Sequence, residues 1–414
     1  MSVHVLILIE NEGYPTDARV SRHADALVNH GYNVTVLAPF KDSSEEPAET
    51  VSGVQVLRYG LGQPVSGRRG YAVEYTRAAF ELGRLVRQVD ARRTVDVVIA
   101  CNPPDFLVAL ARVLLPRRRA VLMDHHDLSP ELYERKFGRR GAPYIALVAA
   151  ERLAFRAAHV VMASNESYAK KTRERGGVAP ERIVTVPHGP DPARIFPVSP
   201  RAELKRGRPL LVTWAGSITQ LDRILTLIEA ADELVNRRGR DDIAFALLGR
   251  GDAKPAVDAE VAARGLEDAV SLPGLASGQL YREYLATADV CVAVDLPNPM
   301  NHHSTVTKVL DYMAMGRPVL QLPLDEMQRV CGDATVYAHD CDPIRFADAL
   351  EALLDDPKRR ADLGRRAREH ILDGGMWPDH VPSLIAAVEI ARELAARPAA
   401  GRVSRSLRRV RLLR

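Results

Sequence analysis

Cysteines, aromatic residues and long apolar runs are scarce in this chain of 414 residues. The four cysteines, Cys101, Cys291, Cys331 and Cys341, have neither CxxC spacing nor histidine partners at zinc-site intervals. We therefore expect free thiols in a reducing compartment and no metal site. No run approaches the roughly 18 apolar residues of a membrane-spanning helix. Residues 3–9 have the pattern of a strand and not of a signal peptide, so we expect a cytoplasmic protein.

Three motifs of common enzyme classes are also missing. No G-x-G-x-x-G follows the first apolar run, and the nearest candidate, Gly60-Leu61-Gly62, has Val65 where the third glycine belongs. The chain has neither a Walker loop nor a serine in G-x-S-x-G. These absences argue against a nicotinamide dehydrogenase, a P-loop nucleoside triphosphatase and a serine hydrolase of the nucleophile-elbow type.

Positive charge is concentrated at the end of the chain. Residues 401–414 carry six arginines and no acidic residue, and removing these six charges from the formal net charge of +4 leaves the other residues at −2. One interpretation of this tail is peripheral contact with an anionic membrane. The other is a solvated, disordered end. No stacking aromatics accompany the arginines, so we do not expect nucleic-acid binding.

Short β-rich apolar runs alternate with longer helical patterns along most of the chain. We predict strands over 3–9, 34–38, 54–58, 97–100, 120–123, 160–163 and 183–186, and then over 210–214, 243–248, 270–272, 290–294 and 319–322. Helical patterns cover 18–30, 73–93, 143–157, 222–237, 254–264 and 343–354. Such alternation produces βαβ units and a parallel sheet with helices on both faces.

A proline-rich basic stretch over 191–209 interrupts this alternation and predicts a linker. The sequence thus predicts an α/β protein of two Rossmann-like, doubly wound domains facing a central cleft. We place the first domain at 1–190 and the second at 210–375, followed by a crossover helix and basic tail at 376–414. Open parallel sheets bind ligands beyond the carboxyl ends of their strands, so the loops after the strands should hold the site.

The most informative of these loops lies within residues 295–322. A helical pattern begins at about Ser304, which we expect to cap it, and ends at Gly316. Free N–H groups at a helix start bind anions, phosphate above all. Lys308 would add a positive charge there, and Asp311 could accept hydrogen bonds from sugar hydroxyls. The alternative is an ordinary amphipathic helix with an i,i+3 ion pair between Lys308 and Asp311.

Five segments, in chain order, resemble the glycosyltransferases usually called family four, which have the GT-B fold. They are PTDARVSRHADALVNHGYNVTVLAP (15–39), DHHDLSPEL (124–132), VPHGPDPARIFP (186–197), STVTKVLDYMAMGRPVLQ (304–321) and DGGMWPDH (373–380). The DHHDLSPEL segment is similar to one found in bacterial members that build surface polysaccharides. In the third segment His188 stands where asparagine is usual.

The resemblance implies a nucleoside-diphosphate sugar as donor, bound mainly to the second domain. Ser304 and Thr305 would meet the diphosphate, Lys308 would neutralise its charge, and Asp311 would bind the ribose. Gly216, Ser217 and the glycine turn at Gly249 would complete the donor site. The chain departs from the family pattern at two places: His303 replaces a second glutamate, and Asp222-Arg223 replaces a Lys-Gly pair. Either Arg223 would contact the diphosphate from a shifted position, or Lys308 alone would neutralise its charge.

In the first domain, the resemblance places His126 against the transferred sugar, where it would bind a hydroxyl or assist proton transfer. Gly13, Tyr14, His125 and Asp127 would line the acceptor side of the cleft. Because His125 and His126 are adjacent, we expect only one of them to face the cleft. From the residues alone, the competing interpretation is a strand-end loop in which Asp127 caps the turn before Pro130.

The function implied by the resemblance is a retaining transfer of a sugar to a lipid-linked, polysaccharide or small-metabolite acceptor. Family members have no clear enzymic nucleophile, and the departing diphosphate takes the acceptor proton, so no resident cofactor or metal is expected. Two alternatives remain open: a sugar-nucleotide epimerase or hydrolase of the same fold, and a non-catalytic partner that has lost donor binding.

Overall fold

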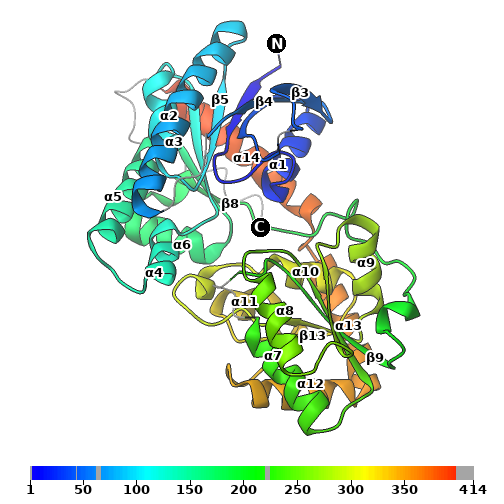
Figure 1. Ribbon diagram of the computed structural model, residues 1–414. Coiled ribbons are helices and arrows are strands. Elements are labelled where there is room, and N and C mark those ends of the chain that lie inside the picture. The colour runs from blue at the N-terminus through cyan, green and yellow to red at the C-terminus, as the bar shows by residue number, and fades with distance from the viewer. Residues whose placement is uncertain (1, 43, 62–66, 220–223, 398–414) are drawn as a thin grey trace. The chain divides into compact units, whose positions relative to one another are not determined.

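The computed structural model describes the chain except for residues 1, 43, 62–66, 220–223 and 398–414 (Figure 1). The chain divides into two compact units: unit 1 comprises residues 1–187 and the chain from 381 onward, and unit 2 comprises residues 188–380. The stretch 191–209, predicted to be a linker, belongs to unit 2. Its Ile195, Val198 and Leu204 pack against the core of that unit.

The sheet of unit 1 has eight strands among the described residues, in the order β3-β4-β2-β1-β5-β6-β7-β8. These strands are β1 (His4–Leu8), β2 (Asn33–Pro39), β3 (Ala48–Val51), β4 (Val54–Tyr59), β5 (Val97–Cys101), β6 (Ala120–His125), β7 (Val160–Ala163) and β8 (Ile183–Thr185). The β3–β4 pair is antiparallel, whereas the pairs around β1, β5 and β6 are parallel. β3 alternates between half-buried and exposed residues at the sheet edge, so it lacks the apolar run that identified the other strands.

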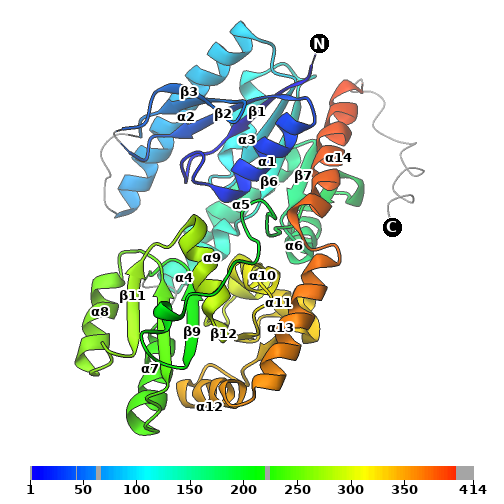
Figure 2. The same ribbon diagram turned by 90° about the vertical axis from the view of Figure 1, so that its right-hand side faces the viewer.

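Helices cover both faces of this sheet. Its helices are α1 (Ala18–Asn29), α2 (Gly67–Arg92), α3 (Phe106–Leu114), α4 (Ser129–Phe137), α5 (Ala142–Ala157), α6 (Glu166–Gly176), the 3-10 turn η1 (Pro180–Arg182) and the part of α14 (Trp377–Ala396) from Val381 onward. Apolar residues of α2, α3 and α5 pack on one face, against Leu6, Val98 and Val121. Figures 1 and 2 show α1 and α14 on the other face.

Unit 2 contains a sheet of six described strands in the order β11-β10-β9-β12-β13-β14. These are β9 (Leu210–Ala215), β10 (Ile243–Leu248), β11 (Val270–Gly274), β12 (Val290–Ala293), β13 (Val319–Gln321) and β14 (Val336–Tyr337). The unit's helices are α7 (Leu225–Asp232), α8 (Lys254–Ala263), α9 (Gly278–Thr287), α10 (Thr307–Ala314), α11 (Asp325–Cys331), α12 (Pro343–Leu354) and α13 (Pro357–Leu372). Shorter turns are η2 (Ala202–Lys205), the π-helix η3 (Glu233–Arg237), η4 (Asn301–His303) and η5 (Gly332–Ala334).

The alternation of side chains along each strand divides the core of unit 2 into two layers. Val212 and Trp214 of β9 pack on the side of α7, α8 and α12. Leu211 and Ala215 of the same strand pack on the side of α9, α10, α11 and α13. This period of two, with apolar residues on both faces, is what a parallel sheet between two helix layers requires. The predicted class, two Rossmann-like α/β domains, is confirmed.

The chain enters unit 2 and leaves it at adjacent points. The backbone N–H of Trp377, where α14 begins, donates to the carbonyl of Pro190 at 2.9 Å. A Cβ on Gly189 would lie 2.7 Å from both the Gly375 oxygen and the Trp377 nitrogen. Only glycine allows the two segments to pack this closely.

Candidate active site

Each sheet has one point where the direction of its strand order reverses. In unit 1 the chain extends from β1 toward β2 and later toward β5 on the opposite side. In unit 2 it extends from β9 toward β10 and later toward β12. The carboxyl ends of strands at such a reversal are where open α/β sheets bind ligands. The loops after β1, β5, β9 and β12 lie at these reversals, and the loops after β6 and β10 follow the neighbouring strands. These six loops are the candidate ligand-binding loops.

In unit 2 the reversal point is occupied by the ammonium group of Lys308. Its Nζ lies 2.9 Å from Oδ2 of Asp295, two residues beyond β12. It also lies 4.8 Å from the ring centroid of Trp214 on β9, close enough for a cation–π contact. The Lys308 side chain is only 16% exposed. A partly buried cation is thus fixed at the carboxyl ends of two adjacent strands.

The helix that carries Lys308 begins later than the sequence predicts. Asn298 Oδ1 accepts from the backbone N–H groups of Met300 and Asn301, which starts the 3-10 turn η4. Ser304 Oγ donates back to the carbonyl of Met300 at 3.0 Å. Ser304 therefore does not cap α10, which begins at Thr307 with Val306 as its N-cap. Both Ser304 and Thr305 are half-buried in the extended segment before the helix.

The loops after β9 and β10, which contain Gly216 and Gly249, are in close backbone contact near Lys308. A Cβ on Gly249, after β10, would lie 2.0 Å from the carbonyl oxygen of Gly216, after β9. The N–H of Gly216 donates to Leu248 at 2.9 Å. A Cβ on Gly216 would also lie 3.3 Å from Lys308 Nζ. Gly216 and Ser217 are exposed, whereas the predicted contact Arg223 lies outside the described residues.

Asp311, one turn further along α10, is held by a half-buried tyrosine. Its Oδ2 accepts from the Tyr281 hydroxyl at 3.2 Å. Burial, with the neighbouring Asp311 carboxylate, raises the pKa of Tyr281 well above its usual value, so the phenol stays a hydrogen-bond donor. Tyr281 comes from α9, far from Asp311 in sequence, and no short motif connects the two. Asp295 and Trp214 were missed for the same reason.

In unit 1 a buried carboxylate, Asp124, organises the loop after β6. Arg19 Nη2 lies 2.8 Å from Asp124 Oδ1, and Arg19 Nε lies 3.0 Å from Oδ2. His126 Nδ1 lies 3.4 Å, and His23 Nδ1 3.7 Å, from the same Oδ2. Burial favours a neutral Asp124, yet Arg19 and His126 hold its pKa well below the usual range.

This carboxylate determines the charge of His126. Burial alone would lower the pKa of His126, but the attraction of Asp124 outweighs it and raises that pKa above its ordinary value. The pKa of His23 instead falls to about 3 through burial and the repulsion of Arg19. His126 is 11% exposed. The predicted catalytic histidine is therefore a fixed, readily protonated imidazole at the edge of unit 1.

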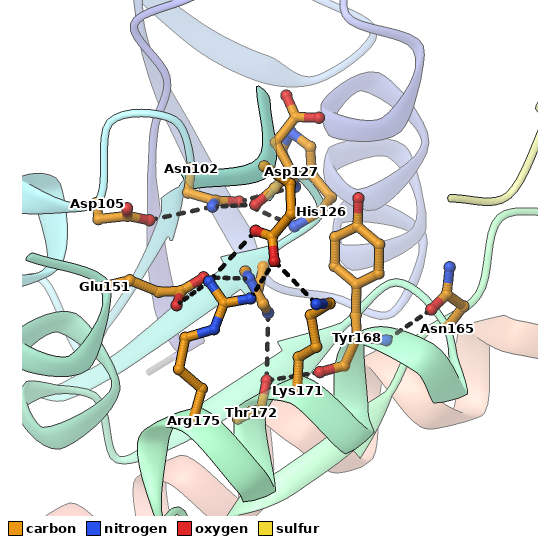
Figure 3. Close-up of polar contacts among 12 residues, drawn as sticks. Asn102, Asp105, His126, Asp127, Glu151, Asn165, Tyr168, Lys171, Thr172 and Arg175 are labelled. Atoms are coloured by element: carbon orange, nitrogen blue, oxygen red, sulfur yellow. Dashed lines mark hydrogen bonds and ion pairs between the residues drawn. The ribbon is translucent and has the colours of Figure 1, made fainter. Parts of the chain in front are cut away.

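Asn102, just after β5, holds the backbone of this loop in place. Its Oδ1 accepts from the N–H groups of His126 and Asp127 at 2.9 and 3.1 Å. Its Nδ2 donates to Asp105 Oδ1 and to the Asp127 carbonyl (Figure 3). Burial, and after it the charge of Glu151, raises the pKa of Asp105 to about 6. Burial likewise raises the pKa of Asp127. Asp127 does not cap the next helix, whose N-cap is Leu128.

His125 points away from His126, into the interior of unit 1. It is fully buried, with Nδ1 3.2 Å from Thr172 Oγ1 and Nε2 3.4 Å from Glu151 Oε1. Its ring packs edge-on against Phe155 at 5.0 Å. The prediction that His125 lines the acceptor side is therefore wrong, because the strand alternation that directs His126 outward directs its neighbour inward.

Figure 3 shows the ion pairs that hold this interior network together. Arg175 Nη1 lies 2.9 Å from Glu151 Oε2, and Lys171 Nζ lies 2.8 Å from Glu131 Oε1. Arg175 also contacts Glu131. Since Glu131 is the last acid of the DHHDLSPEL segment, these contacts anchor the loop that presents His126. Residues of the DHHDLSPEL segment therefore stabilise the loop as well as lining a candidate binding surface.

The loop after β1 places the two remaining predicted residues differently. Gly13 accepts at its carbonyl from the N–H of Asp17, which in turn caps α1 through its side chain. A Cβ on Gly13 would lie 2.7 Å from Lys41 Cγ, so this glycine lies beneath a lysine stem. Tyr14 is 1% exposed. Its side chain belongs to the core and not, as predicted, to an acceptor surface, because burying an aromatic ring removes a large apolar area from water.

No group of three or more histidine, cysteine or acidic side chains positioned to hold a metal ion was found in the described part of the chain. Within the same part, no helix is long and apolar enough to cross a membrane.

Two family models match this chain, one in each unit. The model described as "Glycosyltransferase Family 4" matches residues 18–194, and the one described as "Glycosyl transferases group 1" matches residues 209–356. The first match includes the Arg19, Asp124 and His126 cluster. The second includes Gly216, Gly249, Asp295 and Lys308.

Curated relatives are also transferases of sugars. The chain is 30% identical to an alpha-D-kanosaminyltransferase of Streptomyces kanamyceticus, over 40% of this chain and 43% of that protein. It is 28% identical to a D-inositol 3-phosphate glycosyltransferase of Kineococcus radiotolerans, over 83% of each chain. The alignment with the first of these relatives thus spans less than half of its length.

Solved structures share the fold over nearly the whole chain. The sucrose-phosphate synthase from Thermosynechococcus elongatus superposes with a TM-score of 0.77 at 16% identity, covering 95% of this chain and 99% of that one. Anabaena Alr3699/HepE in complex with UDP and glucose superposes with a TM-score of 0.65 at 16% identity, covering 94% and 98%. At such identities the likeness establishes the fold alone.

Proposed function

We propose that this chain, which belongs to the GT-B glycosyltransferases of the family-four type, moves a sugar from a nucleoside-diphosphate sugar to an acceptor and retains the anomeric configuration. The acceptor is a lipid-linked glycan, a polysaccharide or a small metabolite. The single observation that carries the proposal is the ammonium of Lys308, fixed at the strand reversal of unit 2. A solved structure of the same fold, Anabaena Alr3699/HepE, contains UDP and glucose.

Lys308 would stabilise the negative charge that develops on the diphosphate as the sugar departs. A fixed cation in a partly dehydrated site costs no reorganisation during the reaction. Asp295 holds the ammonium in place, and Trp214 limits the directions in which it can move. The N–H groups at the start of α10 add their partial positive charge on the same side. Asp311, fixed by Tyr281, is available to the ribose hydroxyls.

His126 would contribute from unit 1. With its Nδ1 directed at Asp124, the imidazole can place a hydrogen-bond donor against a hydroxyl of the transferred sugar. Asp124 would act as a positioning residue that keeps this ring oriented and protonated. No paired carboxylates of the glycosidase kind are needed, because the leaving diphosphate takes the acceptor proton.

The test of this function is a panel of nucleotide sugars with different bases and sugars, scored for binding and for slow hydrolysis. Lys308→Ala should weaken nucleoside-diphosphate binding by about 10- to 100-fold, the loss expected for one charge-assisted hydrogen bond. In a thermal-shift assay at a fixed diphosphate concentration, the protection should be smaller in the variant than in the wild type. Lys254→Ala is the matched control, since Lys254 pairs with Asp258 one helix turn away on α8.

The panel also distinguishes the alternatives. Conversion of the donor without transfer to any acceptor would favour an epimerase or hydrolase. A wild-type protein that binds none of the nucleotide sugars would point to a non-catalytic partner. Diphosphate protection as strong in Lys308→Ala as in the wild type would remove Lys308 from the donor site.

Peripheral membrane contact stays a proposal for the arginine-rich segment 401–414, which lies outside the described residues. Lys136, Arg139 and Arg140 at the end of α4 are exposed in unit 1 and could join such a contact. Deleting 401–414 should release the protein from anionic liposomes without loss of fold. If liposome binding survives the deletion, the tail does not bind the membrane and is the solvated end of the alternative interpretation.

A further inference from the structure

Glu10 is a buried carboxylate that the proposed reaction does not use. It is 3% exposed, and its Oε1 has no hydrogen-bond partner in the described part of the chain. Buried carboxylates in folded proteins are normally paired with a cation or with N–H groups, because removing them from water is costly. Among the described residues Oε1 of Glu10 has neither, so its capacity to accept a hydrogen bond is available to a bound ligand.

Its position in the sheet is that of a ligand-binding residue. Glu10 lies two residues beyond β1, the strand at the reversal point of unit 1. Leu8 of β1 is paired with Ala100 of β5, so continuing this register past the strand ends brings Glu10 level with Asn102. Asn102 is the residue that binds the backbone of His126 and Asp127. Glu10 thus shares the strand-end edge that presents His126.

Among the described side chains, the charged and titratable neighbours of Glu10 come from three other elements. They are Glu74 of α2, Lys41 just after β2, and Tyr59 of β4. Burial and the charge of Glu74 raise the pKa of Glu10 to about 7, against the opposite pull of Lys41. Two of these groups are already engaged, since Lys41 Nζ donates to the Asn11 carbonyl at 2.9 Å and the Tyr59 hydroxyl donates to the Ile9 carbonyl at 2.8 Å.

We propose that Glu10 is a specificity residue for the acceptor, whose hydroxyl or ammonium group donates a hydrogen bond to the Glu10 carboxylate. The proposal rests on the proposed transferase function. It implies that the acceptor of this chain has a hydrogen-bond donor, a hydroxyl or an ammonium, that reaches Glu10. Among the described side chains, Glu10 and Glu74 would together repel a phosphate or carboxylate at the same point. Only one cation, Lys41, opposes them among these neighbours.

The experiment compares three matched monosaccharides: glucose, glucosamine and glucose 6-phosphate. Their binding to the full chain is followed by saturation-transfer NMR at pH 7.5, with and without UDP. The wild-type protein should saturate glucose or glucosamine, and glucose 6-phosphate should give no signal. Preference for glucosamine would identify an ammonium as the donor group, and equal binding would identify a hydroxyl.

Glu10→Gln should weaken this binding by about tenfold or more, the effect of losing a hydrogen bond to a charged group. Glu46→Gln is the control, since Glu46 is exposed in the same unit and the change removes the same charge. If Glu10→Gln does not fold, Glu10→Asp provides the same comparison, because it keeps the charge but shortens the reach of the carboxylate.

Two results would overturn the inference: equal saturation in wild type and the Glu10 variant, or a signal from glucose 6-phosphate as strong as from glucose. Failure of the proposed function is separate from this outcome. It would show as missing UDP protection in the wild type, which the Glu10 variants should leave unchanged because Lys308 and its neighbours belong to unit 2.

Discussion

The buried ion pair between Arg19 and Asp124 offers the strongest test of how unit 1 is held together. Asp124 is fully buried and the Arg19 side chain is 5% exposed, so solvent screens their interaction little. Replacing Arg19 by leucine removes both nitrogens that contact the carboxylate. It also removes the Nη1 donor of the Val186 carbonyl at 3.1 Å.

The magnitude follows from what Asp124 would retain. Its remaining partners are His126 at 3.4 Å, His23 at 3.7 Å and the Cys101 thiol at 3.8 Å, each farther from the carboxylate than the Arg19 nitrogens. Breaking one side of a buried pair costs about 3–5 kcal/mol, because an uncompensated charge is left behind. Arg19→Leu should therefore lower the free energy of unfolding of unit 1 by that amount. The double variant Arg19→Leu/Asp124→Leu should recover at least half of it.

Hydrogen exchange followed by mass spectrometry can assign this loss to one unit. Amides of β1, β5 and β6 that exchange through opening of unit 1 should exchange about 10²- to 10⁴-fold faster in Arg19→Leu. Peptides covering β9 and β10 of unit 2 provide the internal reference. Because the folded pKa of Asp124 lies well below the unfolded value of about 4, the stability from this pair is present above pH 4 and lost as the pH falls below it. The difference in free energy of unfolding between the wild type and Arg19→Leu should therefore shrink as the pH falls below 4.

Two results would refute this reasoning. One is a change of less than about 1 kcal/mol in Arg19→Leu, which would mean that the pair is exposed to water in solution. The other is a double variant no more stable than the single one, since the cost would then come from poorer packing and not from an unpaired charge.

Further predictions concern His126 in unit 1 and the glycine loops of unit 2. His126→Ala should keep nucleoside-diphosphate binding and lower turnover by about 10²- to 10⁴-fold; equal activity would return His126 to a structural role. In an NMR titration the pKa of His126 should lie above 6.5. The stability from its contact with Asp124 is therefore complete below pH 6.5, the pKa of an unfolded histidine, and is lost as the pH rises through the higher pKa of the folded protein. Gly249→Ala should destabilise unit 2 by about 1–3 kcal/mol, because its Cβ would collide with the Gly216 carbonyl oxygen. Gly251→Ala should destabilise unit 2 in the same way, because its Cβ would lie 2.1 Å from the Ile218 oxygen. The control is Gly239→Ala, whose Cβ would have no heavy atom within 4 Å and which should show only the smaller cost of its positive φ. A Gly249→Ala protein as stable as wild type would show that the two loops can separate.

The buried parallel strands could be predicted from sequence because both of their faces are apolar. The strand at 160–163 and the helix at 343–354 have the predicted bounds. Helices with mostly polar sequences were missed: α13 buries only Leu363, Gly364, Ala367 and Ile371 of its 16 residues. The start of α10 was misplaced because Asn298, six residues before the predicted cap, forms the turn that delays the helix.

The site could be predicted only where a residue belongs to a short motif. Lys308, Asp311 and His126 were found because each lies in a recognisable segment at a strand end. Asp295 and Tyr281 lie in unremarkable sequence and gain their roles from tertiary contacts with Lys308 and Asp311. Whether His125 or His126 faces outward depends on the exact register of β6, which ends at His125. Composition and spacing do not determine that register.

The contact between Gly189 and Trp377 has a consequence for how such a protein can change over generations. Residues 188–380 form a continuous insertion in unit 1. The first and last segments of this insertion are joined by the 2.9 Å hydrogen bond from the Trp377 N–H to the Pro190 carbonyl. A domain with neighbouring ends can be exchanged between genes as one cassette without redesign of its host. A lineage could thus replace the half that carries Lys308 and keep the half that carries His126 and Glu10. Gly189 would be the position that such an exchange must preserve.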